Sequence, residues 1–496
     1  MKSAEGKFIV VSNAEPYKHE EGKDDEPVCK EVEGGLTTAM NPQMRDSGGV
    51  WIAYGRGEKD FSVTDPDGKV KVPDYPEIPE KDKYTLKRLN FPDSQYRNFY
   101  RGYANRILWP IFHSFPTKAD LRKEYTYWNE GYLPSNKKYA KAIIHAYQPG
   151  DTVWVHDYHL ALVPKLVRNE LPEAEIGLFW HIPWPPWESF GKLPHREEIL
   201  KGLAAADLIG LHLKNYADNL LECAERVGAD LDRGAKRFQL DGEDTQVGAY
   251  PLGVDYRFFD GTDTEGKEAD IRAKYNCDNL ILGVDRQDYT KGIPERIRAF
   301  EKFIEDNPGL REEVTLIQRT PPSRTGIEEY QVEKSKINDQ VSEFNGKFGT
   351  HDWTPIQLFW KGVPQRELIA EYRAADIGLV TPGLDGMNLV AKEFVAANEE
   401  PKVLILSEFA GSSRQLEEAL LVNPYDPDQV AEAIKEGLRM PREEKERRWR
   451  RLRKKVRTED LPSWAESFLK DLENARQLHS MTRFSFPESE PERGLS

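Results

Sequence analysis

The stretch IGLVTPGLDGMNLVAKE, residues 377–393, decides the fold of this chain. It begins with a short apolar run at residues 377–380, passes through a glycine-containing turn and continues with a helical pattern. Apolar runs of this length between turn signals are typical of strands buried on both faces of a parallel sheet. A strand joined directly to a helix is one unit of a layered α/β domain. The segment therefore predicts an α/β fold.

The same alternation extends through most of the chain and divides into two series near residues 251–254. The predicted strands are 8–11, 50–53, 152–155, 176–180, 208–211, 280–284, 314–318, 358–360, 377–380 and 403–406. The predicted helices are 138–146, 215–226, 294–306, 326–345, 367–374 and 428–436. Because ligands of open α/β sheets bind at the carboxyl ends of strands, we expect a substrate cleft between two facing sheets.

The two series set the predicted domain boundaries. We expect one domain over residues 1–252 and a second over 253–458, joined by the polar, turn-rich residues 255–278. Residues 441–457, dense in Arg, Lys and Glu, read as a solvated helix. An amphipathic helix is predicted over 459–482, and the Pro/Glu/Ser-rich tail 483–496 is predicted to be disordered.

Composition narrows the class of partner. The net charge of −15 argues against nucleic acid, because binding phosphate backbones needs clustered Lys and Arg. Cys29, Cys223 and Cys277 lie far apart with no metal-ligand spacing, which fits a reducing compartment. The N-terminal apolar run is too short for a signal peptide, and no stretch approaches the roughly 20 apolar residues of a membrane span. We expect a cytoplasmic protein that acts on small molecules, and a homo-oligomer is compatible with these features.

The turn after residue 380 has the chemistry of an anion and hydroxyl site. Free backbone N–H groups of a first helical turn attract negative charge. Asp385 is a candidate for binding sugar hydroxyls, Gly386 would let a ligand approach the backbone, and Glu393 lies two turns along the same helix. The alternative is an ordinary glycine turn followed by a solvated glutamate.

A second loop, GVDRQDYTKG at residues 283–292, also follows an apolar strand. Arg286 and Lys291 lie within this short loop, and a diphosphate leaving group requires such fixed positive charge. Arg can hold phosphate in a bidentate way while Lys acts as a point charge. The alternative is a pair of exposed cations on an ordinary loop.

Four further segments carry candidate site residues, several of them where strands or turns end. Asp157 in VWVHDYHL and His181 in LFWHIPWP follow apolar strands, although structural histidines are common in such places. The glycine pair ending at Gly35 precedes a helix-like start and could close over phosphates, or form a plain turn. Tyr100 and Trp109 could line a sugar pocket or pack in a core.

Together these segments resemble the trehalose-6-phosphate synthase family of retaining glycosyltransferases. The matching strings run in order over most of the chain: VVSN, GGL, LWP-x-FH, VWVHDYHL, HIPWP, ADLIG, D-R-x-D-Y-x-K-G, PPSR, LDGMNLVAKEFV, SEFAG and NPYD. The resemblance implies a glycosyltransferase-B fold, in which two Rossmann-like domains face each other and a C-terminal helix crosses back to the N-terminal one. It also implies glucose transfer from a nucleotide donor without a cofactor or a required metal.

The resemblance carries roles onto individual residues. It implies donor-binding roles for Gly35, Arg286, Lys291, Asp385, Gly386, Met387, Asn388, Leu389 and Glu393. It implies acceptor-binding roles for Tyr100, Trp109, Asp157 and Arg324. It implies catalytic roles for Asp157, His181, Arg286 and Lys291.

The acceptor side departs from the family pattern. Ala14 stands after VVSN, where the family carries an arginine that helps bind the acceptor phosphate. The string WPIFHSFP is closer to glucosylglycerol-phosphate synthases, which use glycerol 3-phosphate. Three hypotheses follow: a synthase of trehalose 6-phosphate from glucose 6-phosphate with UDP-glucose as the expected donor, a glucosylglycerol-phosphate synthase, and a catalytically silent sugar-nucleotide-binding protein. The donor nucleotide and the oligomeric state stay open.

Overall fold

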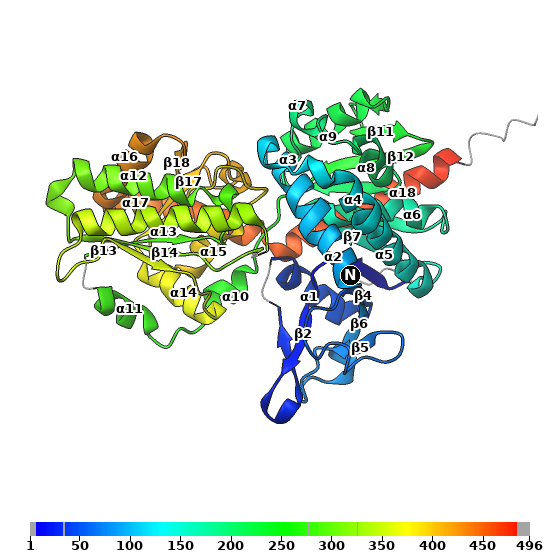
Figure 1. The fold of residues 1–496 in the computed structure, drawn as a ribbon, viewed down its shortest axis with the longest axis horizontal. Helices are drawn as coiled ribbons and strands as arrows, with labels where there is room; N and C mark the ends of the chain where they lie inside the picture. Colours follow the sequence, from blue (N-terminus) through cyan, green and yellow to red (C-terminus); the bar gives the residue numbers. More distant parts are fainter. Residues whose placement is uncertain (1–5, 33–34, 276–277, 325, 484–496) are drawn as a thin grey trace, which may run out of the picture.

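The computed structural model describes residues 6–32, 35–275, 278–324 and 326–483. Two lobes lie side by side, each built around its own sheet (Figure 1). The N-terminal lobe holds β1–β12, and the C-terminal lobe holds β13–β18. The predicted α/β architecture of two lobes, each with a largely parallel sheet, is therefore correct.

In the described residues, the first sheet has ten strands in the order β10-β11-β12-β9-β8-β7-β1-β4-β6-β5. The strands are β1 (Phe8–Val11), β4 (Val50–Tyr54), β5 (Lys69–Val72), β6 (Tyr84–Leu89), β7 (Thr152–His156), β8 (Glu175–Phe179), β9 (Leu208–Leu211), β10 (Asp230–Asp232), β11 (Arg237–Leu240) and β12 (Glu243–Ala249). The interior pairs are parallel, whereas β5, β10 and β11 pair antiparallel at the two edges. A separate hairpin joins β2 (Tyr17–Glu21) to β3 (Pro27–Glu31).

Helices cover both faces of this sheet (Figure 1). They are α1 (Gly35–Ser47), α2 (Asp93–Tyr96), η3 (Arg97–Leu108), α3 (Trp109–Phe112), α4 (Glu124–Tyr127), η6 (Trp128–Tyr132), α5 (Leu133–Ala146), α6 (Val163–Arg168), α7 (Trp187–Phe190), α8 (Arg196–Leu203) and α9 (Lys214–Arg226). Segments η3 and η6 are π-helical. Because π-helical turns are rare and frequently occur at functional sites, the long π-helical segment η3 favours a functional site near it.

The second sheet is parallel throughout, with the order β15-β14-β13-β16-β17-β18 among the described residues. Its strands are β13 (Asn279–Val284), β14 (Val314–Arg319), β15 (Ile356–Phe359), β16 (Ile377–Val380), β17 (Val403–Ser407) and β18 (Leu420–Val422). Its helices are α10 (Tyr256–Gly261), α11 (Lys267–Tyr275), α12 (Ile293–Asp306), α13 (Glu328–Phe348), α14 (Gln365–Ala374), α15 (Leu389–Ala397), α16 (Pro427–Arg439) and α17 (Arg442–Thr458). Helices α10 and α11 occupy most of residues 255–278, so the turn-rich character predicted for this segment is wrong.

The last helix, α18 (Leu461–Arg483), returns to the N-terminal lobe (Figure 1). The Phe468 ring stacks on Trp154 of β7, with ring centroids 4.8 Å apart and planes 6° from parallel. A side chain on Gly177 or Gly210 would collide with Phe468, since an added Cβ would lie within 3.0 Å of its ring. The helix therefore completes the core of the first lobe. From residue 484 onward the predicted tail lies outside the described residues.

Candidate active site

A cavity of about 420 Å³ lies between the two lobes. Its lining residues are Asp157, His181, His212, Leu252, Asp285, Arg286, Lys291, Asp385, Met387, Asn388, Leu389, Val390 and Glu393. They follow β7, β8, β9 and β12 in the first lobe and β13 and β16 in the second, at the carboxyl ends of these strands. The cavity brings together both strand-end segments of the first lobe and both loop segments of the second that the sequence singled out. Most of the predicted site residues thus face one space.

Asn388 begins helix α15 in a left-handed conformation, with φ of 63°. Its side-chain oxygen accepts a hydrogen bond of 3.4 Å from the amide of Ala391 and so caps the helix. The residue at position 386, two before Asn388, is a glycine for a further reason that the sequence did not reveal. An added Cβ would lie 2.5 Å from the backbone oxygen of His181, across the interface between the lobes. Glycine is required here because the lobes approach each other closely, which places the α15 N-terminus against the first lobe.

Lys291 and Asp385 form an ion pair across the cavity wall. Asn388 Nδ2 also donates to Asp385 Oδ2 at 3.1 Å, and Tyr216 of the first lobe donates to the Asp385 carbonyl at 3.3 Å. Burial alone would raise the pKa of Asp385, but Lys291 and Arg286 hold it below its ordinary value. The carboxylate is therefore ionised, and it neutralises Lys291 in the protein without substrate.

Asp288 organises the other cations of the site, and sequence reasoning overlooked it. Its side chain is fully buried, yet it accepts from Arg324 Nη1 at 2.9 Å and lies 3.4 Å from Arg286 Nη2. It also accepts from the amide of Thr290 at 3.1 Å. Burial would raise the pKa of Asp288, but Arg324, Arg286 and Lys291 lower it to about 2. The signal available in the sequence was an acid placed between two cations in the DRQDYTK loop.

Arg324, Trp109 and Tyr100 come together beside the cavity. The Arg324 guanidinium lies over the Trp109 ring at 3.8 Å from its centroid, and its Nη2 donates to the Tyr158 hydroxyl at 3.4 Å. Tyr100 stacks on His159, with centroids 5.6 Å apart. Arg286 also lies over the Trp109 ring, at 4.9 Å. These predicted acceptor residues therefore lie next to the predicted donor cations.

Asp157 and His181 lie at the ends of neighbouring strands. Asp157 Oδ1 accepts from the amides of Tyr158 at 3.0 Å and His181 at 3.3 Å. Burial nevertheless raises the pKa of Asp157 to about 6. The His181 Nε2 atom lies 3.1 Å from His156 Nδ1, so one ring donates and the other accepts. Burial lowers the pKa of both histidines far enough to keep them neutral at pH 7.

Of three further residues, one lines the cavity, one begins a helix and one lies in the core. Glu393 lines the cavity and accepts from the Tyr372 hydroxyl at 2.8 Å, and burial raises its pKa. Gly35 begins α1, while the residue before it lies outside the described residues. Trp51 on β4 is fully buried and donates to Ser12 Oγ at 2.9 Å. It therefore belongs to the core.

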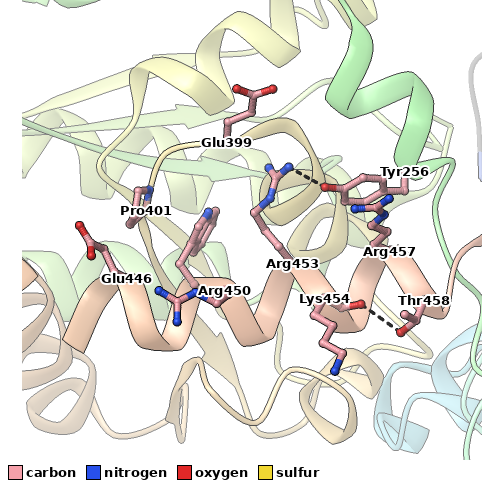
Figure 2. Close-up of a pocket in the computed structure, with 10 residues that line it drawn as sticks. Tyr256, Glu399, Pro401, Glu446, Arg450, Arg453, Lys454, Arg457 and Thr458 are labelled. Atoms are coloured by element: carbon pink, nitrogen blue, oxygen red, sulfur yellow. Dashed lines mark hydrogen bonds between the residues drawn. The ribbon is translucent and has the colours of Figure 1, made fainter. Parts of the chain in front are cut away.

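A second cavity, of about 600 Å³, lies along α17 in the C-terminal lobe (Figure 2). Arg453 extends across it to Asp260 at 2.7 Å and to the Tyr256 hydroxyl at 2.5 Å. Trp449 and Val456 on the same helix are buried in the lobe's core. The predicted solvated helix is thus amphipathic, and its cavity holds none of the predicted site residues.

In the ranges that the structure describes, every helix is too short or too polar to cross a bilayer. Those ranges also bring no three His, Cys, Asp or Glu side chains into an arrangement that could hold a metal ion.

Comparisons with known proteins agree with this geometry. The model of glycosyltransferase family 20 matches residues 6–474. The trehalose-6-phosphate synthase of Mycobacterium avium is 38% identical over 476 residues, which cover 93% of this chain and 94% of that protein. The structure of a UDP-forming α,α-trehalose-phosphate synthase from Burkholderia vietnamiensis superposes with a TM-score of 0.85 at 31% identity, covering 96% and 98% of the two chains. A Burkholderia xenovorans α,α-trehalose-phosphate synthase, solved with glucose 6-phosphate, superposes with a TM-score of 0.82 at 31% identity, covering 94% and 100%.

Proposed function

This chain belongs to glycosyltransferase family 20, and from that premise we propose that it transfers glucose from UDP-glucose to glucose 6-phosphate with retention, forming α,α-trehalose 6-phosphate and UDP. The similar proteins support both substrates, since one is described as UDP-forming and another was solved with glucose 6-phosphate. The observation that carries the proposal is the single cavity in which Arg286, Lys291 and the α15 N-terminus face Asp157 and His181.

On the donor side, the diphosphate lies against Arg286, Lys291 and the amides at Leu389. These groups are fixed before the reaction, so they stabilise the charge of the leaving phosphate without reorganising. Lys291 is paired with Asp385 in the free protein. Donor binding therefore replaces a carboxylate partner by a phosphate, and leaves Asp385 to accept from glucose hydroxyls. Gly386, Met387 and Asn388 present their backbone to the same sugar, Glu393 holds the ribose, and Gly35 closes over the diphosphate.

The chemical step takes place on one face of the glucose. The bond between glucose C1 and the phosphate oxygen breaks, and a bond forms from C1 to the anomeric hydroxyl oxygen of the acceptor. The acceptor's proton passes to the departing phosphate oxygen, so atoms and charge balance and configuration is retained. Asp157 orients the acceptor hydroxyl, and neutral His181 contacts the donor sugar. No close pair of carboxylates is needed as acid and nucleophile, in contrast with retaining hydrolases.

Glycerol 3-phosphate is the second candidate acceptor, because Ala14 replaces the arginine that the family resemblance predicts. The WPIFHSFP string, however, makes contacts within this fold that do not involve a substrate. His113 Nδ1 contacts the Trp109 carbonyl at 2.8 Å, and the Phe115 ring packs edge-on against Tyr289 with centroids 5.5 Å apart. The string therefore gives little reason to prefer glycerol 3-phosphate. A silent binding protein is disfavoured because the cations and carboxylates of the donor side are all present.

The test is UDP release from UDP-glucose with each acceptor in turn, in the presence and absence of EDTA. We expect release with glucose 6-phosphate, none with glycerol 3-phosphate, and no loss with EDTA. ADP-glucose and GDP-glucose serve as donor controls. Release with glycerol 3-phosphate alone would replace the proposed acceptor, and release with neither would leave a binding protein.

A further inference from the structure

The loop after β4 lies directly beside Ala14. The Ser12 amide donates to the Ile52 carbonyl at 3.1 Å, so the ends of β1 and β4 run together. Two residues after β4, the amide of Arg56 donates to Glu15 Oε1 at 2.8 Å. Arg56 is thus anchored next to Ala14 at the carboxyl edge of the first sheet.

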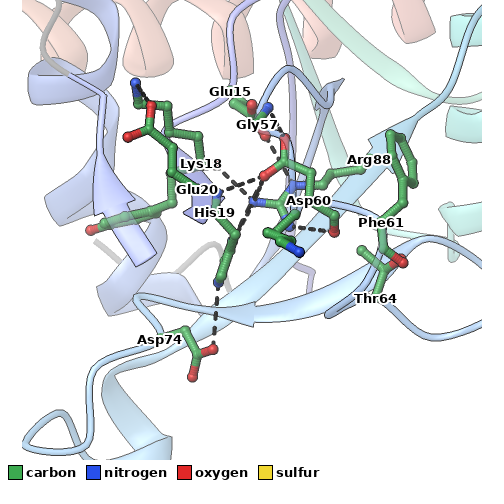
Figure 3. A network of polar contacts seen from close by, with 12 residues as sticks. Glu15, Lys18, His19, Glu20, Gly57, Asp60, Phe61, Thr64, Asp74 and Arg88 are labelled. Atoms are coloured by element: carbon green, nitrogen blue, oxygen red, sulfur yellow. Dashed lines mark hydrogen bonds and ion pairs between the residues drawn. The ribbon is translucent and has the colours of Figure 1, made fainter. Parts of the chain in front are cut away.

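A buried polar network fixes this loop (Figure 3). Arg88 Nε donates to Glu15 Oε2 at 2.9 Å, and its Nη2 lies 3.0 Å from Asp60 Oδ1. The Gly57 amide donates to Asp60 Oδ2 at 2.6 Å. The side chains of Glu15, Asp60 and Arg88 are fully buried. The amides of Arg56 and Gly57 are therefore both held by charge-assisted hydrogen bonds, which fix the backbone from which the Arg56 side chain extends.

A row of stacked rings leads from this loop to Arg324. Tyr54 stacks on Tyr96 with centroids 3.7 Å apart, Tyr96 on Tyr100 at 5.5 Å, and Tyr100 on His159 at 5.6 Å. The last two contacts are nearly parallel, at 11° and 12°. The rings form one wall that ends at the Tyr158–Arg324 contact.

The two guanidiniums act on this wall from its two ends. Burial lowers the pKa of His159 to about 3, and Arg324 and then Arg56 add to the effect. Burial raises the pKa of Tyr96, and Arg56 opposes that rise. The wall therefore lies in the field of both side chains.

Only one of these cations is free to bind an added anion. Arg324 forms an ion pair with the Asp288 carboxylate at 2.9 Å, and Asp288 also forms an ion pair with Arg286. Arg56 is exposed, and among the described residues its guanidinium has no hydrogen-bond or ion-pair partner. A sugar phosphate carries a charge of about −2 at pH 7, more than an already paired guanidinium can balance. The acceptor end of the cleft needs a further cation, and Arg56 is placed to supply it.

We propose that Arg56 is a specificity-determining residue that holds the acceptor phosphate together with Arg324, with the acceptor sugar lying along the wall of stacked rings. The inference rests on the proposed function and gives it a phosphate contact in the absence of an arginine at position 14. Arg56 can grip two phosphate oxygens, which a lysine cannot do in the same way.

The experiment compares Arg56→Gln with the wild type and with Arg226→Gln. Arg226 is an exposed arginine on α9 of the same lobe, 3.6 Å from Glu222, and serves as the matched control. KM and kcat for glucose 6-phosphate are measured by UDP release, and UDP affinity by calorimetry. For Arg56→Gln we expect KM for glucose 6-phosphate to rise about 10- to 100-fold, as for loss of a hydrogen bond to a charged group. UDP affinity and thermal stability should match the control, and Arg56→Lys should recover part of the loss.

A second variant separates a direct contact from a structural effect. Adding Ala14→Arg to Arg56→Gln should restore KM, because it returns a guanidinium to the neighbouring loop. An unchanged KM in Arg56→Gln, with active wild-type enzyme, would overturn the role of Arg56 and leave the proposed function standing. Wild-type enzyme that releases no UDP with glucose 6-phosphate would overturn the proposed function, and this inference with it.

Discussion

Replacing Asp288 with asparagine should destabilise the protein and weaken acceptor binding at the same time. The carboxylate is fully buried and holds Arg324 at 2.9 Å and Arg286 at 3.4 Å. Its pKa is lowered from 3.8 to about 2, and this difference alone corresponds to roughly 2 kcal/mol of stability. The variant also leaves Arg324 buried without its counter-charge, and breaking a buried pair costs about 3–5 kcal/mol. We therefore expect the free energy of unfolding to fall by about 3–5 kcal/mol.

The pH dependence has a defined sign. Because the pKa of Asp288 is depressed in the folded state, its contribution is present above pH 3.8 and is lost as the pH falls towards about 2. Urea denaturation at pH 7 measures the loss in Asp288→Asn, with Asp306→Asn, an exposed pair with Lys302 on α12, as control. KM for glucose 6-phosphate should rise in the same variant because Arg324 loses its anchor. A change in stability below about 1 kcal/mol together with an unchanged KM would refute this account of Asp288.

Three further predictions concern the cleft. Arg286→Ala should lower kcat about 100- to 1000-fold, the scale of losing one preorganised donor, and full turnover in steady-state assays would remove Arg286 from the leaving-group site. Asp157 should be active when ionised, so kcat/KM should rise with pH through about 6. The phosphate of the acceptor titrates near the same pH. The part of the pH dependence that disappears in Asp157→Asn is therefore assigned to Asp157. Gly386→Ala should push its Cβ to within 2.5 Å of the His181 carbonyl and so separate the lobes. We expect a raised KM for UDP-glucose and a lowered kcat, while wild-type kinetics would mean that the interface yields without effect.

Most interior strands were predictable because they are continuous apolar runs, whereas the more polar interior strands β6 and β12 were missed. The runs at β1, β9 and β16 end where predicted, and the other predicted strands differ by one or two residues at their ends. Of the edge strands, β15 was predicted, whereas β5, β10 and β18 were not found. Segments such as β5 (KVKV) and β10 (DLD) alternate or are polar, because one face of a sheet edge meets solvent. Their pattern cannot be told from that of a turn.

The candidate site was predictable where chemistry follows a strand directly, as at Asp157, His181 and Arg286. It was not predictable where the role depends on contacts across the fold. Arg56 stands in a GRGEKD stretch that is typical of a surface turn, and only the folded chain shows that its amide is held by Glu15 next to Ala14. Gly386 was predicted to let a ligand approach the backbone, and the close approach to the His181 carbonyl gives a second reason for glycine, which only the folded chain reveals.

Helix α18 has a consequence for how the protein is made. The N-terminal lobe is synthesised first, yet Phe468 and its neighbours cover Trp154 and Phe179 of its sheet. During synthesis this apolar face stays bare while more than two hundred further residues are added, between Ala249 at the end of β12 and Leu461 at the start of α18. Domains that are finished early usually fold as units before the rest emerges, and exposed apolar surface at that stage invites aggregation. A chain released from a ribosome that stalls before α18 would therefore contain every strand of the first lobe but lack the helix that covers its sheet.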